Sequence, residues 1–369
     1  MSDWRIPLSD IDLGVDEISA VEEVLKSRWL TMGRVTQDFE SAFKTYTGAK
    51  HALAVTNATA ALHMACMAIG LKPGDEVIVP SLTFVASANA IRYTGATPVF
   101  ADITSETDLN ISPDAIEACI TERTRAIMPV QLNGRTADMD RIEAIAAKHN
   151  LIIIEDAAQA LGSKFKGRYA GTFGVAAAFS FYPAKILGCF GDGGAVVTNN
   201  AEIARKISLL RDHGRNENGE VEFWGFNSRL DNLQAAILHA QFRDYDEIID
   251  RRRSIARLYD SLLSDLAELV LPPGPEQGGD HFDVFQNYEI EADRRDELRS
   301  YLSDKGIGTI MQWGGTPVHQ FKGLGFTISL PRTERFFERC LMLPMNMMVT
   351  HEEVRYIAAS VRGFYRGSD

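Results

Sequence analysis

The sequence of 369 residues contains little that would place the protein in a membrane or a secretory class. No apolar run approaches the ~20 residues that a membrane helix needs. The start, MSDWRIPLSD, lacks a basic segment followed by an apolar one, so it does not match a secretory signal. We therefore expect a cytoplasmic globular protein, and its length favours one large domain with a smaller one.

Cysteine is also scarce, and the formal charge is unbalanced. The four cysteines are far apart in the chain and form no CxxC or Cys/His cluster: Cys66, Cys119, Cys189 and Cys340. This pattern argues against a disulfide framework or a zinc site and favours buried thiols.

The net charge of −12 disfavours nucleic acid as a partner. It does not exclude an anionic small substrate, because local donors in a site outweigh the average charge.

Strand-like and helix-like runs alternate through about residue 245, which predicts an α/β fold with a mostly parallel sheet covered by helices on both faces. The early strand-like runs are residues 51–56, 75–80, 96–102, 125–131 and 151–156. From Leu230 to about Leu266 the pattern is almost wholly helical and suggests a bridge. The remainder is typical of a smaller α+β unit. We expect a large domain over 1–245 and a small one over 246–369.

Three consecutive arginines, Arg251, Arg252 and Arg253, lie in the helical bridge. They could form a phosphate clamp. Helical spacing of aliphatic partners beneath them favours a solvated helix face instead.

Lys185 is the strongest candidate for a chemical role. It lies between the apolar segments FSFYP and ILGCF, in a stretch from Phe173 to Gly191 that carries no other charge. Lysines are usually exposed, so this setting indicates a sheltered amine. Such an amine can hold pyridoxal phosphate (PLP) as a Schiff base and later move a proton.

Asp156 closes the apolar run LIIIED, 29 residues before Lys185. The carboxyl ends of parallel strands line the usual ligand crevice, so this side chain is expected to point into it. A carboxylate there would keep the pyridine nitrogen of PLP protonated. Because side chains alternate along a strand, Glu155 should face away.

Four further segments offer contacts to such a cofactor. The order of strand, polar turn and helix in VTNATAALHMACMAIG predicts a phosphate site at Ala58 and Thr59, with the Ser180 hydroxyl as a second donor. Phe84, after a strand end, could cover the ring face. Gln159 could bring an amide to the phenolic oxygen. Each residue also has an ordinary explanation: a helix cap, a core ring or a surface glutamine.

Several long segments together resemble the nucleotide-sugar aminotransferases of the DegT/StrS type, a branch of the fold-type I PLP-dependent transferases. The similar segments span nearly the whole chain: GDEVIVPSLTFVASANAIRYTGATPVFADI, QLNGRTADMD, IIEDAAQALGSKFKGRYAGTFG, FSFYPAKILGCFGDGGAVVTN and WGFNSRLDNLQAAIL. The resemblance implies a role in deoxyamino sugar synthesis, such as that of lipopolysaccharide O-antigen.

The resemblance also implies roles for individual residues. It makes Lys185 the Schiff-base lysine, Asp156 the partner of the pyridine nitrogen and Gln159 the neighbour of the phenolic oxygen. It assigns stacking to Phe84 and phosphate contacts to Ala58, Thr59 and Ser180. It further makes Asn227, in GFNSRL, a phosphate contact from the second subunit of a homodimer with shared sites.

Some segments depart from the family pattern. Ala58 stands where the family usually has glycine, and QLNG replaces an HLYG-like segment. The late segment MQWGGTPVHQF differs from the usual HYP-x-P-x-H. Its residues Trp313, Gly314, Gly315 and His319 therefore mark the predicted sugar-binding part.

The expected reaction is transfer of an amino group from an amino acid, L-glutamate, to a keto group at C3 or C4 of a nucleotide-linked deoxysugar, with pyridoxamine phosphate as the intermediate cofactor form. A PLP-dependent sugar dehydratase is the alternative, but that subgroup resembles this one with histidine in place of Lys185. A non-catalytic regulatory homologue is a second alternative, since fold does not imply function. A dinucleotide-binding oxidoreductase is excluded because no GxGxxG follows the first strand.

Overall fold

A seven-stranded sheet forms the centre of the protein in the computed structural model, which describes residues 4–11, 13–277 and 279–367. The strand order is β1-β9-β8-β5-β4-β2-β3. β9 runs antiparallel to β1 and β8, and the other neighbours pair in parallel, as predicted. The strands are β1 (His51–Val55), β2 (Glu76–Pro80), β3 (Thr97–Ala101), β4 (Thr124–Ile127), β5 (Ile152–Asp156), β8 (Ala176–Ser180) and β9 (Gly194–Thr198).

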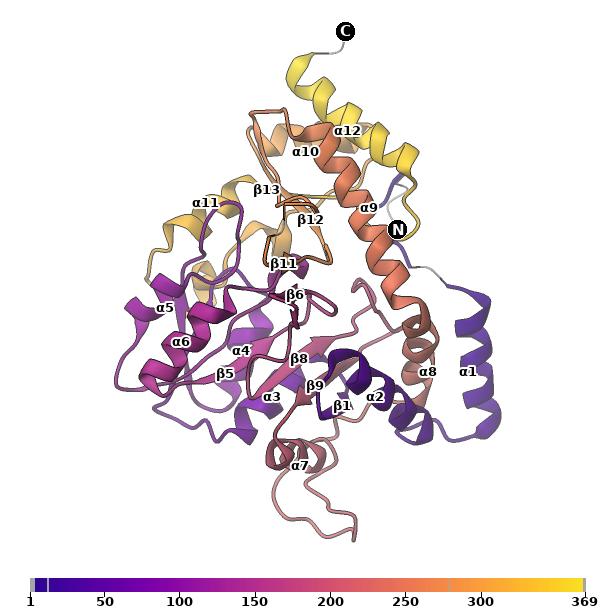
Figure 1. The fold of residues 1–369 in the computed structure, drawn as a ribbon, viewed down its shortest axis with the longest axis vertical. Helices are drawn as coiled ribbons and strands as arrows, with labels where there is room; N and C mark the ends of the chain where they lie inside the picture. The colour runs from indigo at the N-terminus through magenta and orange to yellow at the C-terminus, as the bar shows by residue number, and fades with distance from the viewer. Residues whose placement is uncertain (1–3, 12, 278, 368–369) are drawn as a thin grey trace.

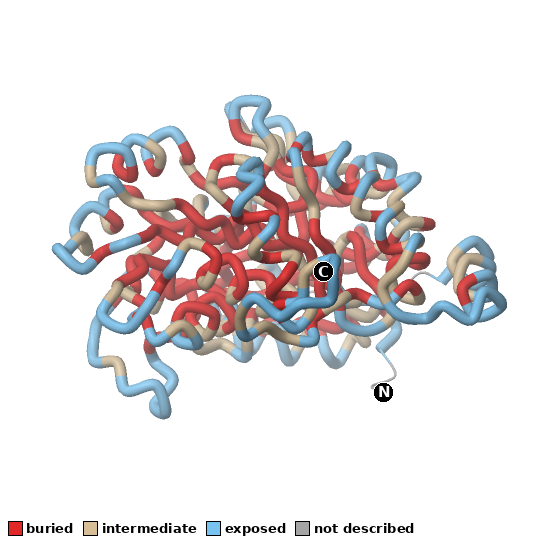
Figure 2. Tube along the Cα trace, turned by 90° about the horizontal axis from the view of Figure 1, so that it is seen from below, coloured by how far each residue is buried: buried red, intermediate tan, exposed pale blue. Residues whose placement is uncertain are grey.

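Helices cover both faces of this sheet (Figure 1). One apolar cluster joins the sheet to α3 (Ala58–Ala68), α4 (Val85–Tyr93) and α7 (Ala201–Leu210). Two clusters on the other face join it to α2 (Arg34–Thr47), α8 (Asn232–Gln241), α5 (Pro113–Cys119) and α6 (Met139–His149). Successive strand residues alternate between these clusters, as the period of a β-strand requires. Figure 2 shows the buried chain running through the middle of the molecule.

A helical bridge leads from the central sheet to the C-terminal part, as predicted. It consists of α8, a 3₁₀ turn η2 (Phe242–Asp244) and α9 (Tyr245–Leu263). A three-stranded antiparallel sheet follows, in the order β10 (Leu269–Val270), β12 (Tyr288–Ala292) and β13 (Cys340–Leu343). With α10 (Arg295–Asp304) and α12 (His351–Arg366) it forms a separate apolar cluster, which also includes Ile6 near the start of the chain. The domain boundary at residue 245 stays a prediction.

Several shorter elements complete the described chain. The helices are α1 (Val15–Ser27), η1 (Leu132–Gly134), η3 (Gln312–Gly315), η4 (Val318–Gln320), η5 (Lys322–Leu324) and α11 (Pro331–Arg339). A second small sheet contains β11 (His281–Phe282), β6 (Lys164–Phe165) and β7 (Arg168–Tyr169). This sheet pairs a late segment of the chain with the part that carries the central sheet.

The prediction of a solvated face for the three arginines is wrong for Arg252. That side chain is buried, and its guanidinium donates to the backbone carbonyls of Phe285, Gln286 and Met345 at 2.8, 2.6 and 3.0 Å. Arg252 therefore fixes the segment that leads into β12. Local helical spacing could not reveal this, because the three acceptors lie far away in the sequence.

Three of the four cysteines are buried, as expected, and Cys119 is partly buried. Burial raises the pKa of each thiol. Among the helices that the structure describes, none is both long and apolar enough to cross a membrane.

Candidate active site

Asp156 lies at the carboxyl end of β5, as predicted, and the structure shows that it is buried. Its Oδ2 accepts a hydrogen bond from the hydroxyl of Ser87 at 2.6 Å, and its Oδ1 accepts one from the backbone N–H of Ala158 at 3.2 Å. Burial raises the pKa of the Asp156 carboxyl, whereas these hydrogen bonds and the nearby Lys185 ammonium oppose the rise. The carboxylate keeps capacity for another donor, because a carboxylate has about four acceptor sites.

Lys185 lies in the loop between β8 and β9. The loop is closed by the Cys189 N–H, which donates to the carbonyl of Phe181 at 2.9 Å, and the Lys185 N–H donates to the carbonyl of Tyr182 at 2.8 Å. Burial lowers the pKa of the Lys185 amine to about 8, and the charge of Asp156 acts in the opposite direction. The charge of Asp156 therefore acts on the Lys185 amine, and the lowered pKa gives that amine an unprotonated population near neutral pH.

A cavity of about 420 Å³ reaches Lys185. Its wall includes Lys185 and Pro183 from the lysine loop, Arg252 from α9, Asp10 from the N-terminal segment and Asn346 from the segment after β13. A small molecule could therefore reach Lys185 from a pocket built by at least four separate parts of the chain.

Glu155 faces the opposite side of the sheet from Asp156, as the alternation predicts. Its carboxylate accepts hydrogen bonds from four donors, namely the backbone N–H groups of Gly171, Phe173 and Gly174 and the side-chain amide of Gln131, at 2.7, 2.6, 2.8 and 2.8 Å. All its acceptor capacity is used within the protein, so Glu155 has a structural role.

The predicted phosphate turn joins β1 to α3. The Asn57 side chain caps the helix by accepting from the Ala60 N–H at 2.8 Å, and α3 begins at Ala58. Gly194 of β9 packs so closely against this turn that an added Cβ would lie 2.7 Å from the Ala58 nitrogen. Ser180 is the register partner of Gly194. Ser180 therefore lies opposite the glycine that packs against the N-terminus of α3, and a helix N-terminus can bind an anion.

Gln159 and Phe84 each follow a strand of the central sheet, Gln159 after β5 and Phe84 after β2. The Gln159 Oε1 accepts the backbone N–H of Asn133 at 2.8 Å, which leaves its amide NH₂ to face another group. Phe84 precedes α4, and its side chain is 55% exposed. Ser87, one turn later, donates to Asp156 and so connects the Phe84 turn with the carboxylate. An exposed aromatic ring beside a buried carboxylate suits the face of a flat ligand.

Asn227 is exposed, in a loop beside the end of β1. The Ser228 hydroxyl lies 2.8 Å from that of Thr56, and Arg229 forms a β-bridge with Val55. The loop therefore lies close to the phosphate turn of its own chain. Its predicted contact with the site of a second subunit stays a prediction.

The predicted sugar-binding segment contains two residues in different situations. Trp313 is partly buried and has a left-handed backbone conformation with φ 47°, followed by two glycines that are also left-handed. His319 is buried, with Nδ1 2.7 Å from the Ser81 hydroxyl and Nε2 3.1 Å from the Glu334 carboxylate. Both ring nitrogens of His319 thus have protein partners, which disfavours a direct sugar contact; the histidine holds its loop against the strand end at Ser81.

The residues above match one known group of proteins. The sequence profile of the DegT/DnrJ/EryC1/StrS aminotransferases matches residues 12–362. The chain belongs to this family. Fold-type I architecture, with its mostly parallel central sheet, agrees with that assignment.

Individual relatives cover nearly all of the chain. A dTDP-3-amino-3,4,6-trideoxy-α-D-glucose transaminase of Streptomyces venezuelae is 39% identical over 97% of this chain and 96% of the relative. A "pleiotropic regulatory protein" of Geobacillus stearothermophilus is 39% identical over 98% and 99%. The crystal structure of DesV from S. venezuelae has a TM-score of 0.94 at 39% identity, covering 99% of this chain and all of the other.

Members of the DegT/DnrJ/EryC1/StrS aminotransferase family are transaminases, and solved relatives in PLP and pyridoxamine phosphate forms imply PLP as the cofactor type. The residues of this chain fit that group. A sheltered amine, a buried carboxylate with spare acceptor capacity and a helix N-terminus lie at one end of the sheet. These match the aldehyde, the pyridine nitrogen and the phosphate of PLP.

Sequence reasoning missed three contributors to this site: Ser87, Asn133 and Gly194. Ser87 and Asn133 act through hydrogen bonds to residues 69 and 26 positions away. Gly194 is one of several glycines after Lys185 in the sequence, and the structure shows why glycine is needed there, because the phosphate turn packs directly against it.

Proposed function

We propose that this protein is a cytoplasmic, PLP-dependent aminotransferase that passes an amino group from an amino acid, L-glutamate, to the C3 or C4 keto group of a nucleotide-linked deoxysugar. The proposal rests chiefly on two side chains: the buried Asp156 carboxylate, which the Ser87 hydroxyl holds at 2.6 Å, and the Lys185 amine, on which the charge of Asp156 acts. Membership of the sugar aminotransferase family supports the substrate class.

The chemical roles follow from the two side chains. Bound PLP supplies an electron sink. Lys185 would hold the cofactor through its ε-amine and, once displaced by substrate, move a proton with the same atom. Its lowered pKa makes the unprotonated form accessible at neutral pH. The Asp156 carboxylate would accept a hydrogen bond from the protonated pyridine nitrogen, and the Ser87 hydroxyl would keep that carboxylate in place.

The remaining residues would bind and orient the cofactor. The N–H groups of Ala58 and Thr59, with the Ser180 hydroxyl, would bind the phosphate, and Phe84 would cover the ring. The Gln159 amide, fixed by Asn133, would donate to the phenolic oxygen. In the part that handles the sugar, the left-handed turn at Trp313 is the better candidate for direct contact, because the His319 ring is already satisfied.

Two alternatives make different predictions. A sugar dehydratase would remove a hydroxyl group from the sugar and would release no amino sugar. The presence of Lys185 argues against this reaction. A regulatory homologue would bind PLP or nucleotide sugar without turnover, and one relative has a regulatory name. The presence of both Lys185 and Asp156 favours catalysis over that role.

We further propose a homodimer in which Asn227 of the partner subunit completes each phosphate site. Trp224 is 93% exposed in the same extended loop, which protrudes beside α7 in Figure 1. Tyr93 and Trp29 add further exposed aromatic surface. A second copy of the chain would cover such apolar surface and could deliver Asn227 to the neighbouring site.

The dimer proposal can be tested by complementation. An inactive Lys185→Ala chain is mixed with an Asn227→Phe chain. In a mixed dimer one site combines both lesions and the other has neither, so activity should return after subunit exchange. If exchange is demonstrated and activity stays absent, Asn227 acts in its own chain or outside the site.

The function itself is tested by product analysis. The purified protein is incubated with PLP, L-glutamate and a panel of dTDP-, UDP- and GDP-linked 3- and 4-ketosugars, and products are identified by mass spectrometry and NMR. The proposal expects one aminated sugar together with 2-oxoglutarate. A dehydrated sugar would support the first alternative, and binding without any product would support the second.

A further inference from the structure

The loop that carries Lys185 is held by an amide side chain from a distant segment. The Oε1 of Gln286 accepts the backbone N–H of Ile186 at 3.0 Å, and its Nε2 donates to the backbone carbonyl of Ala184 at 2.9 Å. The two bonded residues are the immediate neighbours of Lys185. Gln286 is only 6% exposed, so water competes little for these hydrogen bonds.

The backbone of Gln286 is fixed as firmly as its side chain. Its N–H donates to the carbonyl of Asn133 at 3.0 Å, and its carbonyl accepts from the buried guanidinium of Arg252 at 2.6 Å. Phe285, the preceding residue, has a left-handed conformation with φ 53°. An unfavourable backbone conformation persists only where surrounding contacts impose it.

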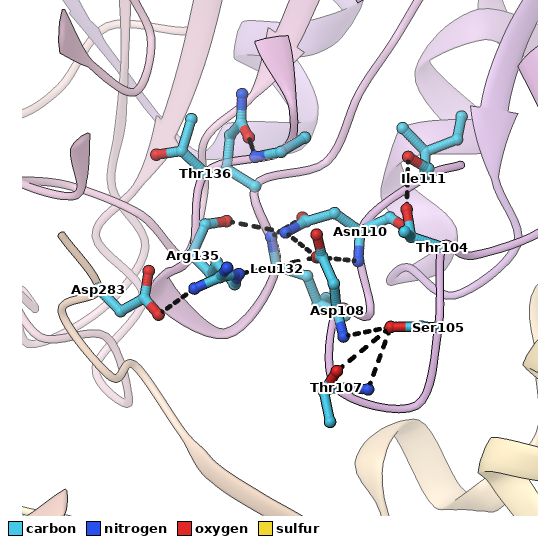
Figure 3. Close-up of polar contacts among 12 residues, drawn as sticks. Thr104, Ser105, Thr107, Asp108, Asn110, Ile111, Leu132, Arg135, Thr136 and Asp283 are labelled. Atoms are coloured by element: carbon cyan, nitrogen blue, oxygen red, sulfur yellow. Dashed lines mark hydrogen bonds and ion pairs between the residues drawn. The ribbon is translucent and has the colours of Figure 1, made fainter. Parts of the chain in front are cut away.

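The segment before Gln286 is anchored to the η1 turn as well. The Arg135 guanidinium donates to the Asp283 carboxylate at 2.6 Å, as Figure 3 shows, and the Val284 N–H donates to the Gly134 carbonyl at 2.9 Å. Asn110 holds the same turn by accepting the Leu132 N–H at 3.0 Å (Figure 3). The segment that carries Gln286 is therefore held in place by hydrogen bonds to the η1 turn.

We infer that Gln286 is a positioning residue for Lys185, an inference that rests on the proposed function. Lys185 lies in a loop without strand or helix pairing, so its side chain is directed by whatever fixes the loop backbone. Gln286 fixes it on both sides of the lysine. Loss of the clamp would let the amine move into water and away from Asp156. Relief of burial, the larger of the two influences on this amine, raises its pKa, and the lost attraction to Asp156 only partly offsets that rise.

The same loop offers a matched control. Gln234 of α8 makes the same kind of bidentate contact with Phe190, accepting its N–H at 2.9 Å and donating to its carbonyl at 3.2 Å. Phe190 lies five positions after Lys185. A Gln→Met change at either site keeps the approximate side-chain volume and removes both hydrogen bonds. Gln286→Met frees the loop next to Lys185, whereas Gln234→Met frees it at Phe190.

The test uses the cofactor-free protein. Trace acetylation with acetic anhydride across pH 6–11, followed by peptide mass spectrometry, gives the titration midpoint of Lys185. Asp156 is the charged group whose field acts on the amine. The charged residues that line the same cavity as Lys185 are Asp10, Asp16, Glu17, Asp244 and Arg252, and all of these groups are unchanged in both variants. Gln286→Met should raise the midpoint by about one pH unit. It should also slow PLP attachment at neutral pH about tenfold. Gln234→Met should stay near wild type in both measurements.

Equal midpoints and attachment rates in Gln286→Met and wild type would overturn the inference. A similar shift in both variants would also contradict it, because general loosening of the loop would then suffice. Gln286→Asn, whose shorter amide cannot span both contacts, replaces the methionine variant if thermal unfolding shows that the latter is not folded. If wild type itself binds no PLP, the proposed function fails, whereas the midpoint still reports on the clamp.

Discussion

The two carboxylates that end β5 lie on opposite faces of the same strand and differ in how completely the protein satisfies them. Glu155 accepts hydrogen bonds from four donors, and within the described part of the chain none of these donors is titratable. Asp156 accepts hydrogen bonds from two groups among the described residues, the Ser87 hydroxyl and the Ala158 N–H, and its charge acts on the Lys185 amine. Burial raises the pKa of both carboxyls. Burial alone therefore does not identify a functional acid; unused acceptor capacity beside a sheltered amine does.

The comparison predicts that the two faces respond differently to mutation. Changes on the Asp156 face should reduce chemistry while leaving stability nearly unchanged. Changes on the Glu155 face should reduce stability while leaving the chemistry of the folded fraction intact.

Removal of the amine should have the largest effect. Lys185→Ala should lower transamination by roughly 10⁴-fold, because one atom performs both nucleophilic and proton-transfer duties. Single-turnover assays measure the loss, and circular dichroism should show an unchanged fold. Substantial residual activity in the folded variant would assign the amine role to another lysine.

Asp156→Asn should lower turnover by about 10²- to 10³-fold, because a neutral amide no longer stabilises the protonated pyridine nitrogen. PLP affinity, measured by fluorescence titration, should change only a few fold, since the phosphate contacts at Thr59 and Ser180 would remain. Near-normal turnover would instead make Asp156 a structural cap.

Glu155→Gln should destabilise the protein by about 2–4 kcal/mol, because its new NH₂ group faces backbone N–H donors that lose an acceptor. Urea unfolding of the cofactor-free protein measures this, with Asp156→Asn as the matched variant, expected within about 1 kcal/mol of wild type. Equal losses in the two variants would remove the distinction between the faces.

The last prediction concerns how the free energy of unfolding depends on pH. Between the folded pKa of Lys185, about 8, and the ordinary lysine value of 10.5, the unfolded chain binds a proton that the folded chain does not. The stability of the cofactor-free protein should therefore rise with pH through this window, and Lys185→Met should lack that rise. Chemical unfolding at pH 7.5, 9 and 10.5 tests the difference; parallel curves for both proteins would contradict it.

Much of this arrangement could be predicted from local sequence. The period of two in LIIIED predicted that Asp156 and Glu155 would face opposite ways, and the order of strand, turn and helix predicted the α3 terminus. Alternating apolar runs predicted the mostly parallel sheet. These features depend on residues close together in the chain.

The unpredicted parts depend on contacts between distant residues. The Ser87 hydroxyl donates to Asp156, and the Gln286 amide binds the loop that carries Lys185. The buried Arg252 guanidinium donates to carbonyls of two later segments. The partners of His319 were likewise hidden, because Ser81 lies 238 positions away. No local pattern encodes such pairs. The sequence could therefore predict which segment handles the sugar, but not which of its side chains contacts the sugar.

The most direct test of the central claim is to locate the cofactor on the chain. Purified protein saturated with PLP is reduced with borohydride, digested, and mapped by mass spectrometry. The account predicts one labelled peptide that contains Lys185, within residues 179–195, and a yellow chromophore that reduction removes. A label on a lysine elsewhere, or no chromophore at saturating PLP, would contradict the account.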